Sequence, residues 1–317
     1  MMKERREDLH GRIDRILFLS GIVLFIIHSI RPIPFKAQLI FFIITVLLAG
    51  IPHGALDHLV EEKSLRLENK KFTWLVFLAN YFLYMLLFGL IWYFLPSAAL
   101  ILFLVFSSIH FGETDLLRVK TSGGFITTLM QFCYGSFILL TLLLSHLSEV
   151  RQIVQQYPEL ISPRYLEFVE IHTKDIIFGS GMLAAAVTFI YFIKTGQDSE
   201  GLFSFSFFGK LIIIMTLLIM LPLILAFSFY FGLWHSLHSL ENIRNHLSRQ
   251  GQTPVSWTAL LKKSMPLTLL AILFIAAIVY FARFDRNSSS LLLQFFIGIA
   301  ILTAPHLQVM GRMYRRR

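Results

Sequence analysis

Long apolar runs recur along the whole sequence, and most are long enough to cross a membrane as a helix. A membrane-spanning helix needs about 20 mostly apolar residues. The 317 residues are 56% hydrophobic and only 15% charged, whereas a soluble domain carries about 25% charged residues. We therefore predict an all-α, polytopic integral membrane helical bundle of about 8–10 transmembrane helices. The candidate spans are residues 15–30, 36–52, 72–95, 97–111, 124–147, 176–193, 208–234, 266–283 and 291–306.

The segments between the apolar runs are too short to form a second, soluble domain. We find no repeats and no low-complexity tracts, so residues 1–317 are predicted to be one transmembrane domain. The first run lacks a small-residue cleavage site and leads into another span, so we expect it to stay in the membrane.

The net charge of +9 does not indicate a nucleic-acid-binding protein, because Lys and Arg lie between the apolar runs instead of forming one patch. In those places they favour one membrane topology and contact anionic lipid headgroups. The single cysteine, Cys133, excludes an internal disulfide and a cysteine-based metal site.

The distribution of Lys and Arg also tests the number of crossings. Nine crossings divide these residues almost equally between the two sides, although cytoplasmic loops should carry an excess. If residues 123–234 contain one crossing fewer or one more, the predicted cytoplasmic loops again carry an excess of Lys and Arg. Ten crossings arise if the stretch 202–240 contains an extra crossing and is broken at Pro222. We therefore predict an even number.

Four polar motifs follow four of the apolar runs, each at the C-terminal end of its predicted helix. With an even number of crossings, all four reach the same cytoplasmic-side layer. The motifs are "PHGALDH" (His53, Asp57, His58), "IHFGETD" (His110, Glu113, Asp115), "LWHSLHSLEN" (His235, His238, Glu241) and "APHLQVM" (His306).

These motifs have the composition of a metal site. A single histidine at a helix end is usually an interfacial polar residue, but four such motifs in one layer favour a shared site. A ligating imidazole usually gives its other ring N–H to a carboxylate or carbonyl. Imidazole ligands without thiolate suit iron, copper or zinc. The histidines outside this pattern are predicted to be structural or solvent-facing: His10, His28, His146, His172 and His246.

In this order, the motifs resemble those of the Brp/Blh family of bacterial and archaeal carotenoid-cleaving enzymes. The resemblance runs from the second apolar run to the last, and "PHGALDH" followed by "HFGETD" is its most specific part. It implies an Fe(II)-dependent dioxygenase of the plasma membrane, the inner membrane where there are two. Such an enzyme splits the central double bond of β-carotene with O₂ into two molecules of retinal, and retinal would supply a microbial rhodopsin.

The resemblance also implies the metal ligands. His53, His110 and His235 match three proposed iron ligands. The family pattern at the third motif places a fourth histidine four residues after the third ligand, where this chain has Ser239. His238 lies one residue earlier and is our first candidate for the fourth ligand, with His58 and His306 as alternates.

Four carboxylates are expected beside the metal, where they would fix imidazole tautomers: Asp57, Glu113, Asp115 and Glu241. The 32 Phe residues include candidates for an apolar substrate channel, although most are expected to face lipid or to pack between helices.

Other functions remain open from the residues alone. A histidine-lined transporter and a haem protein would also place histidines in spans. A carotenoid-binding protein without cleavage activity would share the apolar channel. A di-iron desaturase is disfavoured, because the sequence contains neither an HxxxH motif nor an HH pair.

Overall fold

The computed structural model describes residues 2–116, 124–157, 159–195, 205–248, 255–282 and 291–315. Within these ranges the chain forms helices and connecting segments, with no strand. In chain order the helices are α1 (Met2–Ile30), α2 (Phe35–Thr45), the π-helix η1 (Val46–Gly50), α3 (Ile51–Gly54), α4 (Asp57–Leu67), α5 (Trp74–Phe94), α6 (Pro96–Asp115), α7 (Phe125–Leu144), α8 (Leu147–Val154), α9 (Pro163–Ile171), α10 (Thr173–Thr195), α11 (Phe205–Met220), α12 (Leu223–Phe227), the π-helix η2 (Ser228–His235), α13 (Ser236–Leu247), α14 (Trp257–Ala282) and α15 (Leu291–Arg315).

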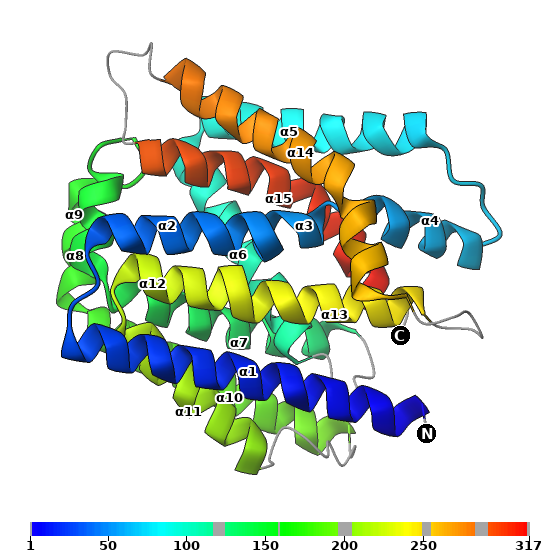
Figure 1. The fold of residues 1–317 in the computed structure, drawn as a ribbon. Coiled ribbons are helices and arrows are strands. Elements are labelled where there is room, and N and C mark those ends of the chain that lie inside the picture. The colour runs from blue at the N-terminus through cyan, green and yellow to red at the C-terminus, as the bar shows by residue number, and fades with distance from the viewer. Residues whose placement is uncertain are drawn as a thin grey trace.

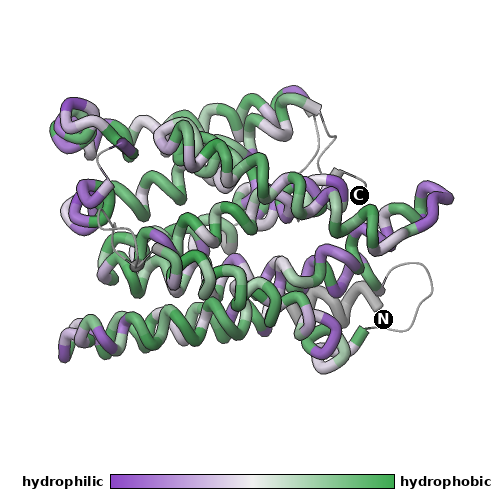
Figure 2. Tube along the Cα trace, turned by 90° about the horizontal axis from the view of Figure 1, so that it is seen from above, coloured by the Kyte–Doolittle hydropathy of each residue, from purple (hydrophilic) through white to green (hydrophobic). Residues whose placement is uncertain are grey.

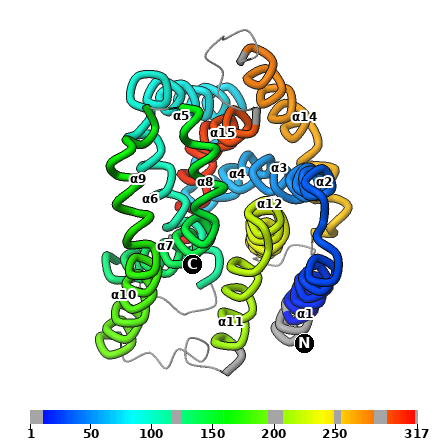
Figure 3. The backbone as a smooth tube through the Cα atoms, turned by 90° about the vertical axis from the view of Figure 1, so that its left-hand side faces the viewer, coloured from blue at the N-terminus to red at the C-terminus, as the bar shows by residue number. Residues whose placement is uncertain are grey.

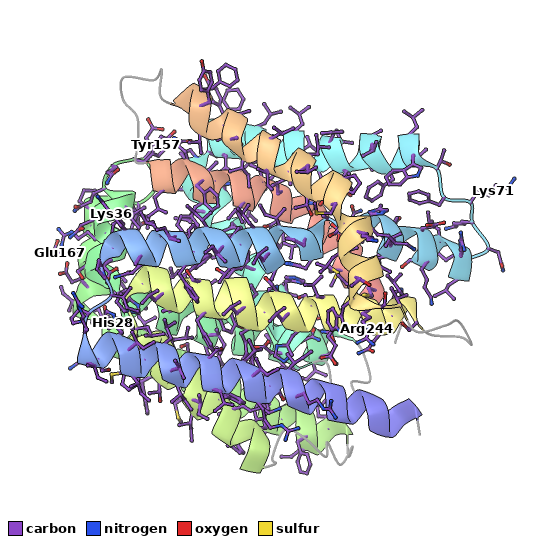
Figure 4. The ribbon with its side chains drawn as sticks, in the orientation of Figure 1. His28, Lys36, Lys71, Tyr157, Glu167 and Arg244 are labelled. Atoms are coloured by element: carbon purple, nitrogen blue, oxygen red, sulfur yellow. The ribbon has the colours of Figure 1, made fainter. Side chains whose placement is uncertain are left out.

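The long helices lie alongside one another in a bundle, as Figure 1 shows. Over the described residues, nine helical stretches are long and apolar enough to cross a membrane, and a tenth apolar helix, Phe207–Met220, is shorter. Hydrophilic residues gather at the two ends of the bundle, while the middle of the helices is hydrophobic (Figure 2). Lys71 and Arg244 lie at one end, and Lys36 and Glu167 lie at the other (Figure 4). The protein is therefore a multi-pass membrane protein, as predicted.

The region 208–234 is not one continuous helix. It divides into α11, which ends at Met220, and α12, which begins at Leu223. Pro222 cannot donate a backbone hydrogen bond, so the helix stops there. α11 and α12 run in opposite directions, and both chain termini lie at the same end of the bundle (Figure 1). The helix is thus broken at Pro222, as the ten-crossing alternative requires, while the even number of crossings stays a prediction.

A histidine holds the turn between α11 and α12. Nε2 of His146 lies 2.6 Å from the carbonyl oxygen of Leu221, and its Nδ1 lies 2.8 Å from that of Leu142. The buried ring thus ties the end of α7 to a carbonyl group at the break, where no helical N–H is in place to satisfy it. His146 is structural, as the sequence indicated.

The segment from α12 to α13 forms the centre of the molecule. Of the apolar window in Leu223–Leu247, 78% is buried, against 17% for the windows in α1, α5, α10 and α14. The view along the bundle shows α12 surrounded by other helices (Figure 3). The third polar motif therefore enters the interior of the protein.

α6 and α7 cross at two glycines. A Cβ atom at Gly112 would overlap the backbone of Gln131, and one at Gly135 would overlap the backbone of Ser108. Only glycine permits such close approach of two helices in a membrane protein. This contact fixes the rotation of α6, which carries the second polar motif.

Candidate metal centre

The four polar motifs converge at one end of the bundle interior. They bring together four buried histidines: His53 on α3, His110 on α6, His235 at the end of η2 and His306 on α15. These helices are separated by up to 253 positions in sequence, since His53 and His306 come from opposite ends of the chain. Their meeting is therefore a product of the tertiary fold.

The four imidazole rings form a closed square. His235 lies with its ring centroid 5.5 Å from that of His53 and 4.8 Å from that of His110. His306 lies 5.0 Å from His53 and 5.1 Å from His110. Neighbouring rings meet edge to face, with interplanar angles of 74–89°. Four rings thus surround one central space.

The nitrogen atoms have the spacing that a metal site requires. One ligand atom from each of His53, His110 and His235 lies within 4.8 Å of the others. Two nitrogens on opposite sides of one ion lie about 4.2 Å apart when each bond is about 2.1 Å. Small side-chain adjustments would therefore bring all three onto a common ion.

Several of these nitrogens have no protein partner. Both ring nitrogens of His110, Nδ1 of His235 and Nε2 of His306 are buried without a hydrogen bond. Leaving a buried polar atom unpaired costs about 1–3 kcal/mol. Three of the four rings thus carry an unpaired buried nitrogen, which is the arrangement expected of residues that fit a metal ion.

Two of the imidazoles are oriented through their other nitrogen. Nδ1 of His53 lies 3.2 Å from the carbonyl oxygen of Ala49. Nδ1 of His306 lies 2.8 Å from Oδ1 of Asp57. The hydroxyl of Tyr81 donates to Oδ2 of the same carboxylate over 3.0 Å. If Nδ1 is the protonated nitrogen in both rings, Nε2 keeps the lone pair that a metal needs.

The first candidate for a fourth ligand, His238, lies elsewhere. Its Nε2 is 2.8 Å from Oδ1 of Asp14, and its Nδ1 is 2.7 Å from the carbonyl oxygen of Trp234. Three helical residues turn the chain by about 300°, which leaves His238 about 60° from the direction of His235. That difference points His238 at α1 instead of at the square. Lys210 completes this second polar group by an ion pair with Asp14.

The two alternates for the fourth ligand, His58 and His306, also lie in different places. His58 stacks on Trp74, with ring centroids 5.1 Å apart, and its Nδ1 lies 3.1 Å from the carbonyl oxygen of Ala55. It takes no part in the square. His306 belongs to the square, although nothing in its motif favoured it over His58.

The four carboxylates predicted to lie beside the metal have different contacts. Asp57 contacts a square imidazole directly, whereas Glu113 stays 4.0 Å from Nδ1 of His110. Asp115 instead accepts a hydrogen bond of 3.0 Å from Tyr230 and one of 3.5 Å from Tyr134. Glu241 is buried on α13.

Local helix distortions aim the histidines inward. The π-helix η1 ends just before the Pro52–His53 pair, and η2 ends at His235. On α15, His306 follows Pro305 inside the helix. π-helical turns and internal prolines change the direction of the side chains that follow, and π-helical turns are frequent at functional sites. Sequence periodicity did not predict the two π-helices, and it also missed Tyr81.

An apolar cavity of about 430 Å³ adjoins the square. All four imidazoles and Asp57 line it, together with aromatic and aliphatic side chains such as Phe77, Met85 and Phe231. A volume of this size is typical of a small-molecule site. The lining suits a large nonpolar ligand.

The family model for beta-carotene 15,15'-dioxygenase matches residues 44–314. The chain belongs to this dioxygenase family. A beta-carotene 15,15'-dioxygenase from uncultured marine bacterium 66A03 is 25% identical over 274 residues, which cover 85% of this chain and 92% of that protein. No solved structure matches the chain.

As a member of this family, the protein is a carotenoid dioxygenase. The matched range includes all four histidines of the square and both π-helices, and it leaves α1 outside. The apolar cavity beside the square accords with a carotenoid substrate, which carries little or no polar surface.

Proposed function

We propose that this dioxygenase cleaves the central 15,15′ double bond of β-carotene with O₂ at an iron ion held by His53, His110, His235 and His306. The observation that carries the proposal is the square of buried imidazoles, with unpaired nitrogens, at the wall of an apolar cavity. Each carbon of the cleaved double bond receives one oxygen atom of O₂, so one C₄₀ polyene gives two C₂₀ aldehydes, which are retinal.

The donor set suits a redox metal. Four imidazoles without thiolate or carboxylate fit iron, copper or zinc, and of these zinc has no redox chemistry. Iron, when bound, would supply the activation of O₂. His306 is the best fourth ligand, because its ring completes the square and its unpaired Nε2 is buried.

The protein residues contribute positioning and exclusion of water. Asp57 and Tyr81 hold the His306 ring in one orientation. Phe111 lies 4.7 Å from the ring of His235, and Phe231 stacks on it at 6.1 Å. These aromatic walls would place one double bond of the polyene beside the square and keep water away from it.

The partners follow from this reaction. β-Carotene and O₂ both dissolve in the lipid bilayer, where the protein resides. Retinal would leave into the same membrane, and a microbial rhodopsin would accept it there. For a bacterial or archaeal protein we place this reaction in the plasma membrane.

Alanine variants in a bacterium that makes β-carotene test the proposal. His53→Ala, His110→Ala, His235→Ala and His306→Ala should each lower bound iron to about a tenth of the wild-type content or less. Retinal formation should fall with it. Metal analysis of the purified protein and chromatography of the cell extract measure the two effects.

His58→Ala and His238→Gln are matched controls, because both histidines are buried in the same layer but outside the square. Glutamine at position 238 can still donate to Asp14. Both variants should retain iron and cleavage. Full iron content in His306→Ala would remove this residue from the ligand set, and wild-type protein without iron would refute the metal site.

A further inference from the structure

The cavity beside the imidazole square reaches the outer surface of the bundle. Three of its lining residues are exposed: Phe82 on α5 is 51% exposed, and Leu270 and Leu273 on α14 are 46% and 66% exposed. We propose that these residues frame a lateral portal, through which the carotenoid enters directly from the hydrocarbon of the bilayer. This inference rests on the proposed function and adds the route of the substrate.

The two helices that frame the portal form an outer wall of the bundle. α5 and α14 each pack on α15, and both lie on the same side of the molecule (Figures 1 and 3). Only 17% of the apolar window of either helix is buried. Their outer faces are therefore in contact with lipid.

The portal lies at the depth of the hydrocarbon. Phe82 comes eight residues after the first residue of α5, about 12 Å along a helix of about 30 Å. Leu270 lies thirteen residues after the start of the 26-residue helix α14. An opening at mid-helix faces acyl chains, where a polyene dissolves, and not the headgroups or water.

A bend in α14 accompanies the opening. The helix changes direction in its first half and then crosses the outer face obliquely (Figure 1). Pro266 lies inside α14, where its ring and its missing N–H disrupt the helical hydrogen bonds. The cavity-lining residues of α14, from Leu267 to Ile275, all follow this proline.

The chemistry of the lining selects a ligand without polar groups. Among the described residues, Asp57 is the one acidic side chain that lines the cavity, and no Lys or Arg does so. Asp57 is already hydrogen-bonded to His306 and Tyr81. A lipid with a charged headgroup would find no partner along this path, whereas a hydrocarbon polyene needs none.

Tryptophan at the rim tests the portal. Leu273→Trp should narrow the opening, whereas Leu269→Trp serves as the matched control. Leu269 is one helical turn earlier on α14, is 54% exposed, and does not line the cavity. The purified, iron-loaded proteins are placed in phosphatidylcholine vesicles that contain β-carotene. Iron content and folding should be equal in both variants and the wild type.

Two kinetic measurements separate entry from binding. With continuous supply of substrate and O₂, Leu273→Trp should form retinal severalfold more slowly than the wild type and Leu269→Trp. After long anaerobic loading with β-carotene, addition of O₂ should give a first turnover at the wild-type rate in all three proteins.

If Leu273→Trp forms retinal at the wild-type rate in the first measurement, the portal proposal is wrong. It is also wrong if the first turnover is slowed as much as later ones, because Leu273 would then limit binding and not entry. If wild-type protein binds carotenoid but forms no retinal, the proposed function fails. The portal is then tested by the rate of carotenoid uptake, which is measured from the change in carotenoid absorption. Uptake should still be slower in Leu273→Trp.

Discussion

Asp57 connects the cavity wall to the imidazole square through two hydrogen bonds. Its carboxylate accepts from Nδ1 of His306 and from the hydroxyl of Tyr81, which lies on α5. A carboxylate in this place fixes the tautomer and the direction of a ligating ring. Tyr81 in turn fixes the carboxylate, so it would help to hold the proposed metal ion without touching it.

We expect Asp57→Asn to weaken iron binding by about 10–100-fold, because an amide orients the ring less strongly than a carboxylate. Tyr81→Phe removes one hydrogen bond of about 1 kcal/mol, which corresponds to roughly fivefold weaker binding. Competition with a chelator measures both affinities. Tyr84→Phe is the control: its hydroxyl accepts a bond from Gln308 at the surface. Equal affinities in Tyr81→Phe and Tyr84→Phe would contradict the positioning role.

At the level of the helices, close backbone contacts determine which side chains face the centre. η1 and η2 pack against each other, and a Cβ atom at Gly232 would overlap the side chain of Thr45. The crossing of α6 and α7 depends on Gly112 and Gly135 in the same way. The square is therefore sensitive to changes that lie outside it.

Gly135→Ala should destabilise the protein by about 1–3 kcal/mol, because the added methyl group meets the backbone of Ser108 and α6 must move. Gly179→Ala on α10 is the control, since nothing lies within 4 Å of a Cβ atom there. Thermal unfolding of the purified protein in detergent compares the two. A wild-type melting temperature in Gly135→Ala would show that the two helices separate at little cost.

At the level of the whole molecule, both termini lie at the same end of the bundle as α4 and α13, which begin in the first and third polar motifs (Figure 1). The end that holds Lys71 and Arg244 is the one that the distribution of Lys and Arg assigns to the cytoplasm (Figure 4). We therefore expect the square to lie toward the cytoplasmic side of the membrane.

Reporter fusions test this topology. Green fluorescent protein should be fluorescent at either terminus, and alkaline phosphatase should be inactive at either terminus, because both would remain in the cytoplasm. Fusion of the phosphatase in the segment between α1 and α2 should give an active enzyme. Opposite results at the two termini would indicate an odd number of crossings and contradict α11 as a separate traverse.

The sequence by itself determined the class of the fold and the four polar motifs that make up the candidate centre. Hydropathy is a local property, so apolar runs and the polar motifs at their ends can be read without the fold. The four histidine motifs were found for this reason, whereas the choice of His53, His110 and His235 as ligands came from the resemblance to the Brp/Blh family. The break at Pro222 was foreseen because proline acts on its own helix.

Only the tertiary structure decided which other imidazole joins them. His238 and His306 lie in similar motifs, but the rotation of each helix directs His238 to Asp14 and His306 to the square. That rotation depends on the π-helices, the glycine crossings and the packing of distant helices. Side-chain direction changes by about 100° per residue, so small changes in helix register select different partners. The same packing brought Tyr81 to Asp57 and left the cavity open between α5 and α14.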